Sequence, residues 1–468
     1  MNQLAIVVCL WVVVHCFRRD ARENPDASPA LWIPLAWMFL AGSRYVSSWL
    51  SLSSPGGSGS YDEGSPVDRV VFFALILLAL IVLSRRRLEW GQILACNRLL
   101  AFYLFFCLVS VMWSDEPSIG FRRWVKDLGN PVMALVILTD PRPMVALGIV
   151  LRRLGYLLLP LSVLFIRHFP ELGRDYHANG SPMYTGVGHQ KNALGQMCLV
   201  IGTYIGWQIV VNRATFLGWA RGRRLRLWML AAMMAWLLNM SNSQTSLATM
   251  LVVLTIFFLA RCSFIVRQPT RLVLVLLGSA ILLGSLEASF ELKNQVLDLL
   301  GRDPSLTKRT DLWALLFELA DSPVFGAGFM SFWSGERLNI IWQRLGTPVL
   351  QAHSGYIEQY LNLGYLGVGL IVMLMLKGVA GARSMARTDA PFAHLRLCFV
   401  VAAAIYNYTE AAFYGINNMW VLMLCGLIVV PLSATRHASA VGSHTALPPT
   451  PPVADAASIR RPPYAPRR

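Results

Sequence analysis

The chain has 468 residues, of which 55% are hydrophobic and 14% are charged, and its mean hydropathy is +0.51. Soluble domains carry about a quarter charged residues, so this composition excludes an ordinary soluble protein and indicates a membrane protein. The formal net charge is +16. The basic residues lie between apolar runs, where membrane proteins carry their topology signals, and no nucleic-acid recognition motif accompanies them. We therefore expect no nucleic-acid partner.

Apolar segments follow one another along most of the chain. A helix that crosses the bilayer needs about 20 apolar residues. The first segment, 3–17, precedes Arg18, Arg19 and Arg22 rather than following basic residues, so it predicts a first span with an outside N-terminus and not a secretory signal. The amphipathic segment 121–138 spans the membrane or is re-entrant, so we predict an all-α polytopic protein of 12 or 13 transmembrane helices. The predicted spans are 3–17, 31–52, 69–84, 98–113, 121–138, 144–166, 191–211, 226–240, 245–260, 271–288, 355–377, 394–410 and 416–433.

The basic residues fall mainly in every second connection between these spans, and such connections are cytoplasmic. The long polar segment 289–354 then lies on the extracytoplasmic side. The chain is thereby divided into transmembrane helices 1–10 (1–288), this loop, transmembrane helices 11–13 (355–433) and a tail (434–468). The tail is rich in Pro and Ala, so we expect it to be disordered and cytoplasmic.

The eight cysteines lie in or beside apolar spans, and none forms a Cys-x-x-Cys pair. This pattern argues against a disulfide framework or a zinc site, and the extracytoplasmic segments hold no acidic ligand cluster. We therefore expect neither a metal nor a cofactor.

Polar and charged residues inside spans or at their external ends are costly in a bilayer, so each is a candidate for function. Several lie at the predicted starts of helices, where unpaired N–H groups and the helix dipole favour anions. Thr310 is a plausible N-cap for a helix over 311–320. Arginine grips two phosphate oxygens at once, so cationic helix starts that meet on one face suit a diphosphate. The candidates are Arg44, Arg122, Arg123, His189, Lys191, Asn192, Lys308, Arg309, His353 and Glu410.

Other roles for these residues remain open. Lysine and arginine near the ends of spans often extend to the lipid headgroups and have no other function, an interpretation that we favour for Lys126, Arg167 and Arg174. Histidine at the start of a helix is usually a cap or a packing residue, although His353 and His189 are also possible acid–base groups.

Several motifs resemble those of the O-antigen ligase and polymerase superfamily of bacterial membrane enzymes, over roughly residues 32–424. Gly188-His189-Gln190-Lys191-Asn192 resembles the family's Gly-His-Lys-Asn signature with Gln190 as an insertion, and the stretch 306–313 resembles Leu-Thr-Gly-Arg-Thr-x-x-Trp with Lys308 in place of Gly. The stretch 323–328 resembles Pro-x-x-Gly-x-Gly, and 352–356 resembles His-Asn-x-Tyr with Ser354 in place of Asn. Features at 42–44 and 329–333 favour the exopolysaccharide-production branch.

The resemblance implies a glycosyltransferase-C-like enzyme of the bacterial inner membrane, with the long loop in the periplasm. Such an enzyme transfers or polymerises undecaprenyl-diphosphate-linked oligosaccharide repeats into a surface polysaccharide, without metal. Carried onto this chain, the resemblance assigns Arg309, with Arg123 and Lys191, to the diphosphate, and His353 to activation of the acceptor hydroxyl. Arg44, Arg122 and Lys308 are further candidates for the diphosphate because of their positions in the sequence. Its partners would be the lipid-linked donor, a glycan or lipid acceptor, the bilayer, a flippase and a chain-length regulator.

Two alternative functions remain open. A ligase would use the same donor but attach the glycan to lipid A core or to a protein. A transporter or flippase would explain the many spans and the intramembrane Arg44, although transporter sites usually lie near the midplane of the membrane rather than in an external loop.

Overall fold

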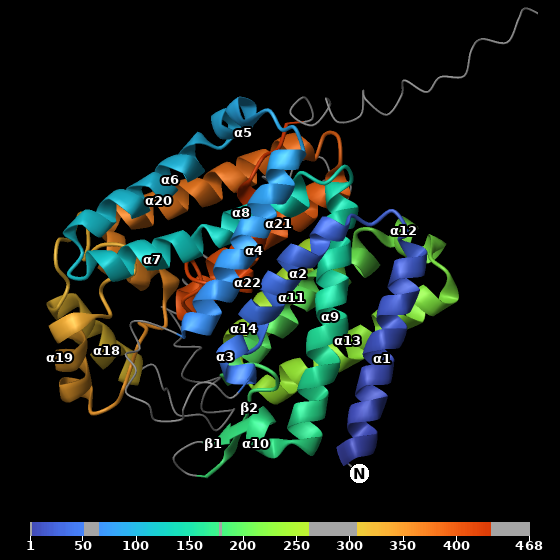
Figure 1. Cartoon of the computed structure of the whole chain (residues 1–468), viewed down its shortest axis with the longest axis horizontal. Helices are drawn as coiled ribbons and strands as arrows, with labels where there is room; N and C mark the ends of the chain where they lie inside the picture. Colours follow the sequence, from blue (N-terminus) through green and yellow to red (C-terminus); the bar gives the residue numbers. More distant parts are fainter. Residues whose placement is uncertain (1, 51–64, 177–179, 262–306, 432–468) are drawn as a thin grey trace, which may run out of the picture.

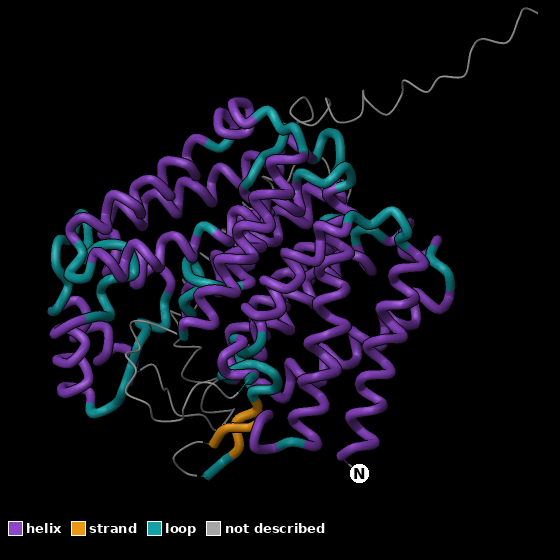
Figure 2. Tube along the Cα trace, in the orientation of Figure 1, coloured by secondary structure: helices purple, strands orange, loops and turns teal. Residues whose placement is uncertain are grey.

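The computed structural model describes residues 2–50, 65–176, 180–261 and 307–431. Within these residues the fold is a bundle of helices with one short pair of strands, as Figures 1 and 2 show. The predicted all-α polytopic class is confirmed. The predicted span 271–288 and the predicted tail 434–468 lie outside the described residues.

The elements follow the predicted spans in chain order. The first half holds α1 (Asn2–Glu23), η1 (Pro29–Leu31), α2 (Trp32–Gly42), α3 (Val46–Trp49), α4 (Pro66–Arg85), α5 (Trp90–Cys96), α6 (Arg98–Ser110), η2 (Val111–Trp113), α7 (Pro117–Asp127), α8 (Gly129–Leu138), α9 (Pro143–His168), α10 (Pro170–Gly173), β1 (Arg174–Tyr176) and β2 (Pro182–Tyr184). The second half holds α11 (Lys191–Val210), α12 (Arg213–Gly218), α13 (Arg221–Ser241), α14 (Gln244–Leu259), α18 (Thr307–Glu318), α19 (Gly335–Leu345), α20 (Gly355–Met385), α21 (Ala390–Thr409) and α22 (Asn418–Leu427). The strands β1 and β2 pair antiparallel, with Arg174 opposite Tyr184.

Five helices in the described residues are long and apolar enough to cross a membrane: α4, α9, α11, α20 and α21. A sixth span results if α5 and α6 with η2, which meet at 86°, are counted together, and shorter apolar helices include α14 and α22. Most of α9, α11 and α21 is buried among other helices, whereas α4 buries only one stripe. Its exposed face carries Val70, Phe73 and Leu77. Exposed apolar side chains at this density suit contact with lipid rather than water.

The predicted spans 31–52 and 121–138 are each divided into separate helices. The segment 31–52 breaks after Gly42, and α3 begins only at Val46. Here the backbone N–H and the hydroxyl of Ser47 both donate to the Asp68 carboxylate, at 3.0 and 2.5 Å, which ties α3 to α4. The segment 121–138 divides into α7 and α8. A Cβ at Gly129, the first residue of α8, would lie 2.0 Å from the Trp37 ring, so only glycine permits this approach.

The helix α20 contains a break at Gly364, whose φ is +63°. A segment far away in sequence docks there: Ala327 N donates to the Leu361 carbonyl at 2.9 Å, and Gly328 N donates to the Asn362 carbonyl at 2.9 Å. The Gly326–Gly328 turn therefore packs on the backbone of α20 instead of projecting into solvent.

The bundle has two distinct ends in Figure 1. The N-terminus, α3, α10, the β1–β2 pair, α18 and α19 lie toward the lower end, and α5 and α12 lie toward the upper end. The start of α11 faces the lower end, and its last turn faces the upper one. The helix α11 thus connects the two polar regions described below.

Candidate functional site

A polar cavity of about 580 Å³ opens where α11 begins and α21 ends. The break between α2 and α3 forms one wall, the segment before α20 forms another, and the turn between α21 and α22 closes a third side. The lining residues are Ala41, Ser43, Tyr45, His189, Gln190, Asn192, Ala193, Gln196, Pro348, Val349, Leu350, Gln351, His353, Tyr406, Glu410, Ala411, Ile416 and Asn417. Five separate chain segments build this cavity, which is a usual size for a small-molecule site.

Glu410 is the centre of the polar contacts in this cavity. It directly follows the last residue of α21, and its carbonyl accepts a bond from Gly355 N at 2.9 Å, which joins the end of α21 to the start of α20. Asn192 Nδ2 donates to Glu410 Oε1 at 2.6 Å. Arg309 Nη2 lies 3.7 Å from the same oxygen, and Arg309 Nη1 donates to the Thr409 carbonyl at 3.0 Å. The carboxylate therefore holds one cation and one amide at the cavity.

His353 faces Glu410 from the opposite wall. Its Nδ1 lies 4.0 Å from Glu410 Oε2, and this buried nitrogen has no hydrogen-bond partner within the described chain. The His353 backbone has φ +53°, a left-handed conformation that costs a residue with a Cβ about 1–2 kcal/mol. Strain of this kind often marks a functional position.

The residue before His353 is held from two sides. Trp313 Nε1 donates to the Ala352 carbonyl at 2.8 Å, and Ala352 N donates to Glu358 Oε1 at 2.6 Å. Glu358 is fully buried on α20 and also accepts from Trp333 Nε1, at 2.9 Å to Oε2. These contacts fix the strained backbone of His353. The sequence analysis missed Glu358, although a carboxylate inside a predicted span was the signal that could have found it.

Arg44 and His189 lie beside the break between α2 and α3. Arg44 Nη2 donates to the Leu172 carbonyl, and the Tyr45 ring meets the His189 ring edge-on with centroids 6.5 Å apart. Burial lowers the pKa of His189 below its ordinary value, and the positive charge of Arg44 lowers this pKa further. His189 is therefore a neutral hydrogen-bonding group near pH 7. Arg44 is not one of the residues that line the cavity.

The other candidate cations are not among the residues that line the cavity. No lysine or arginine belongs to its lining within the described residues. Arg123 donates to the Met330 carbonyl, Arg122 is exposed on α7, and Lys191 is the first residue of α11. Lys308 lies in the first turn of α18, with its side chain outside the described atoms. Among the predicted diphosphate residues, Arg309 forms an ion pair with the lining residue Glu410.

The structure corrects one local prediction. The helix α18 begins at Thr307, so Thr310 lies inside it and is not its N-cap. Among the described residues no three His, Cys, Asp or Glu side chains gather as metal ligands. Sequence reasoning also did not foresee Tyr45, Gln196 and Tyr406 in the lining, because the fold alone brings their segments together.

The fold and this cavity define a class: a multi-pass helical membrane protein with a polar cavity at one end of its bundle. Residues 214–372 match the family model of the O-antigen ligases. The chain is also 26% identical over 338 residues to the exopolysaccharide production protein ExoQ of Rhizobium meliloti, an alignment that covers 67% of this chain and 71% of that protein. The predicted resemblance to the O-antigen ligase and polymerase superfamily, with its preference for the exopolysaccharide branch, is confirmed. The family match includes Arg309 and His353, whereas Asn192 and Glu410 lie outside it.

Proposed function

We propose that this protein is a metal-independent glycosyltransferase that polymerises undecaprenyl-diphosphate-linked oligosaccharide repeats at the external face of the inner membrane. One observation carries the proposal: His353, Glu410, Asn192 and Arg309 meet at an open polar cavity between apolar helices. A base, a carboxylate that orients it and a cation are the groups that glycosyl transfer from a lipid diphosphate needs. The name of the exopolysaccharide relative supports a surface polysaccharide as the product.

The chemistry follows from the positions of these groups. The imidazole of His353 takes the proton from an acceptor sugar hydroxyl, and the resulting oxygen attacks the anomeric carbon of the donor. The bond from that carbon to the diphosphate oxygen breaks, and the lipid diphosphate leaves with the electron pair. A positioned base of this kind accelerates transfer by about 10²–10⁴-fold.

In this scheme Glu410 orients the base, His353, and stabilises its protonated form. With Nδ1 of His353 directed at Glu410, the other ring nitrogen is left for the acceptor, and the carboxylate stabilises the imidazolium that forms. The 4.0 Å separation shortens when substrate binds, since catalytic hydrogen bonds are often long in empty sites.

Arg309 is our candidate for the leaving diphosphate. Its side chain is 29% exposed and is held by one long ion pair to Glu410 and one hydrogen bond to the Thr409 carbonyl, so its other N–H donors are available to phosphate oxygens. We propose Arg44, Arg122, Arg123, Lys191 and Lys308 as secondary contacts along the path of the donor. The apolar helix faces would hold the polyprenyl tail.

The topology forms part of the same proposal. The segment 289–354 is periplasmic, and the predicted division at 288 and 355 separates it from the spans. A flippase that delivers the donor and a chain-length regulator are the expected partners.

A ligase is the second candidate, because the matched family model is described as O-antigen ligase. It would use the same cavity and donor, but its acceptor would be lipid A core or a protein. Only the acceptor distinguishes the two activities.

The test is an elongation assay with the purified full chain and an undecaprenyl-diphosphate-linked repeat, with and without EDTA. We expect longer lipid-linked glycan from the wild type, unchanged by EDTA, and strong losses in Arg309→Ala and His353→Ala. Full activity in His353→Ala would place the base elsewhere. Product that forms only after lipid A core or a protein is added would identify a ligase, and transport without elongation would identify a transporter.

A further inference from the structure

A second polar pocket lies at the other end of α11. It has a volume of about 250 Å³ and is lined by residues from the loop after α1, the start of α9, the end of α11, α12 and the start of α13. Gln208 on α11 lines this pocket, and Asn192, at the first cavity, lies sixteen positions earlier on the same helix. At 1.5 Å per residue the two pockets are separated by about 24 Å, close to the thickness of a bilayer core.

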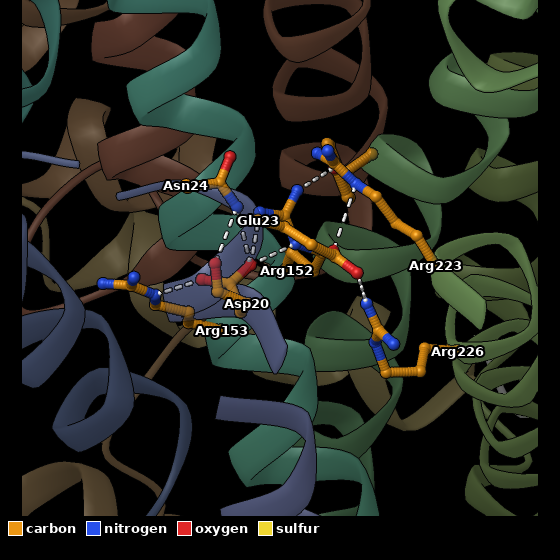
Figure 3. Close-up of polar contacts among 8 residues, drawn as sticks. Asp20, Glu23, Asn24, Arg152, Arg153, Arg223 and Arg226 are labelled. Atoms are coloured by element: carbon orange, nitrogen blue, oxygen red, sulfur yellow. Dashed lines mark hydrogen bonds and ion pairs between the residues drawn. The ribbon is translucent and has the colours of Figure 1, made fainter. Parts of the chain in front are cut away.

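A cluster of charged side chains, drawn in Figure 3, contributes Arg152 and Arg223 to the lining of this second pocket. Asp20, fully buried, binds Arg152 Nε at 2.7 Å and Arg153 Nε at 2.7 Å. Glu23 pairs with Arg226, and its Oε2 lies 3.7 Å from Arg223 Nε. Four guanidinium groups thus share two carboxylates, which leaves an excess of two positive charges. This excess is partly buried, since the Arg152 side chain is 3% and the Arg223 side chain 19% exposed, and an anion that binds there would offset it.

A buried donor without an acceptor belongs to the lining of the same pocket. Gln208 is 2% exposed and lines it, and its Nε2 has no hydrogen-bond partner among the described residues. Asn212 Nδ2 donates to Gln208 Oε1 at 3.3 Å, which sets the amide so that its Nε2 remains the free donor. Tyr204 accepts from Arg152 Nη1 at 3.2 Å and keeps its own hydroxyl proton to donate.

Arg223 completes this set of donors. Its Nε lies 3.7 Å from Glu23 Oε2, an ion-pair distance without a hydrogen bond, and its guanidinium carbon lies 3.9 Å from the centre of the Trp219 ring. The stacked ring holds the planar group at the pocket, where Trp219 and Arg223 are both lining residues. The helices α9 and α13 also begin at this pocket, and their N-terminal dipoles favour an anion.

We propose that this pocket binds the phosphate group of an anionic ligand at the membrane face opposite the first cavity. Excess positive charge, a buried unpaired amide and a stacked arginine are what a phosphate requires, and the volume suits a phosphate or a phosphodiester headgroup. Two sources share this chemistry: an anionic phospholipid of that leaflet, since basic pockets between transmembrane helices bind such headgroups, and a soluble phosphate.

The test uses native mass spectrometry of the delipidated full chain with phosphatidylglycerol, phosphatidylcholine or inorganic phosphate as the probe. We expect the wild type to bind phosphatidylglycerol in preference to phosphatidylcholine. Gln208→Leu and Arg223→Gln should each weaken this binding about tenfold or more, because each removes a donor to phosphate. The matched control is Arg221→Gln, which removes an exposed arginine from the same helix outside the pocket and should leave binding unchanged.

Each outcome has a defined meaning. Binding of phosphatidylglycerol but not of inorganic phosphate, with this pattern of variants, assigns the pocket to a lipid headgroup. Saturable binding of inorganic phosphate with the same pattern assigns it to a soluble anion. If neither probe binds, or if Gln208→Leu binds as well as the wild type, or if Arg221→Gln loses as much as Arg223→Gln, the proposal is wrong. Gln208→Glu keeps the test informative should Arg223→Gln fail to fold, because its added negative charge should abolish binding.

Discussion

Glu410 contacts more of the proposed machinery than any single cation does. Its two carboxylate oxygens face Asn192 and Arg309 on one side and His353 on the other. A carboxylate at this position prevents Arg309 and His353 from repelling each other when the histidine becomes protonated. Because Arg309 already pairs with Glu410, an anionic donor has to compete with this carboxylate for the guanidinium group.

Replacing Glu410 tests whether it acts through His353. We expect Glu410→Gln to slow elongation at least about tenfold, since the oriented base contributes about 10²–10⁴-fold. If the two residues act as a unit, the double variant Glu410→Gln with His353→Ala should be no slower than His353→Ala alone. The measurement is the initial rate of elongation in all four proteins of this cycle. Losses that multiply in the double variant would contradict the coupling.

His189 should make the stability of the protein depend on pH. Its folded pKa is lowered, first by burial and then by Arg44, so the folded state binds fewer protons than the unfolded state once the pH falls below about 6.5. The contribution of His189 to stability is therefore present above that pH and is lost as the pH falls through its lowered folded pKa. Arg44→Gln removes a cause of the lowering and should reduce the acid loss.

The measurement is the melting temperature of the purified protein from pH 7.5 to 5, for the wild type, Arg44→Gln and His189→Gln. Both variants should show a shallower decline toward acid than the wild type, whatever their melting temperatures at pH 7.5. Three parallel curves would show that another group governs the acid response.

At the scale of single elements, the break in α20 decides where the site residues lie. Gly364 permits a turn of backbone that lets the segment around Val324 dock on the helix, and Asn362 Oδ1 accepts from Phe332 N at 3.1 Å beside it. Trp333, which follows, then reaches Glu358, and Glu358 holds the residue before His353. The break therefore supports the candidate base through a short series of contacts.

Gly364→Ala should be strongly destabilising. The added Cβ would lie 2.2 Å from the Val324 backbone, and φ +63° disfavours any residue with a side chain, so we expect a loss of at least about 2 kcal/mol and lower activity. Gly369→Ala is the matched control on the same helix, because its Cβ would meet nothing within 4 Å and alanine favours a helix by about 1 kcal/mol. Gly364→Ala should therefore have a lower melting temperature and a lower elongation rate than Gly369→Ala. Equal values for the two variants would mean that the segment around Val324 does not pack tightly against Gly364.

Much of the element pattern was predictable from sequence, and its interruptions were not. Long apolar runs specify helices because the backbone must satisfy its own hydrogen bonds in lipid, so the positions of α4, α9, α11 and α21 follow from hydropathy. The breaks after Gly42 and at Gly364 depend on partners more than 20 residues away, Asp68 and Val324 among them. Hydropathy carries no information on such partners. Glycine within an apolar run is common in membrane helices, so neither break was visible.

The candidate site was predictable to a similar extent. Four candidates were proposed because polar residues at the ends of spans are costly in a bilayer, and all four line one cavity: His353, His189, Asn192 and Glu410. Arg122 and Arg123 met the same criterion but lie on α7 outside the lining, and Lys191 adjoins the lining residues Gln190 and Asn192 without being one itself. The sequence thus showed which polar residues lie at helix ends, but not which of them are neighbours in the fold.

At the scale of the whole molecule, the two pockets lie at opposite ends of α11, and the proposed topology assigns them to opposite faces of the membrane. Cysteine labelling tests this topology, in a background where Cys96 and Cys262 are replaced by serine, since the remaining cysteines are buried. Glu336→Cys on α19 and Arg221→Cys on α13 both lie at exposed positions. We expect a membrane-impermeant maleimide to label Glu336→Cys in intact spheroplasts and Arg221→Cys only in inverted vesicles. The reverse pattern would overturn the orientation, and labelling of both from one side would overturn the span count.

The left-handed backbone at position 353 has a consequence for which substitutions the protein tolerates. Glycine and asparagine adopt φ near +53° readily, whereas valine and isoleucine do so only with considerable strain. In a library of all replacements at this position, membrane abundance and polysaccharide synthesis should therefore become uncoupled. Glycine and asparagine variants should accumulate at normal levels while making little product, and β-branched variants should be depleted from the membrane.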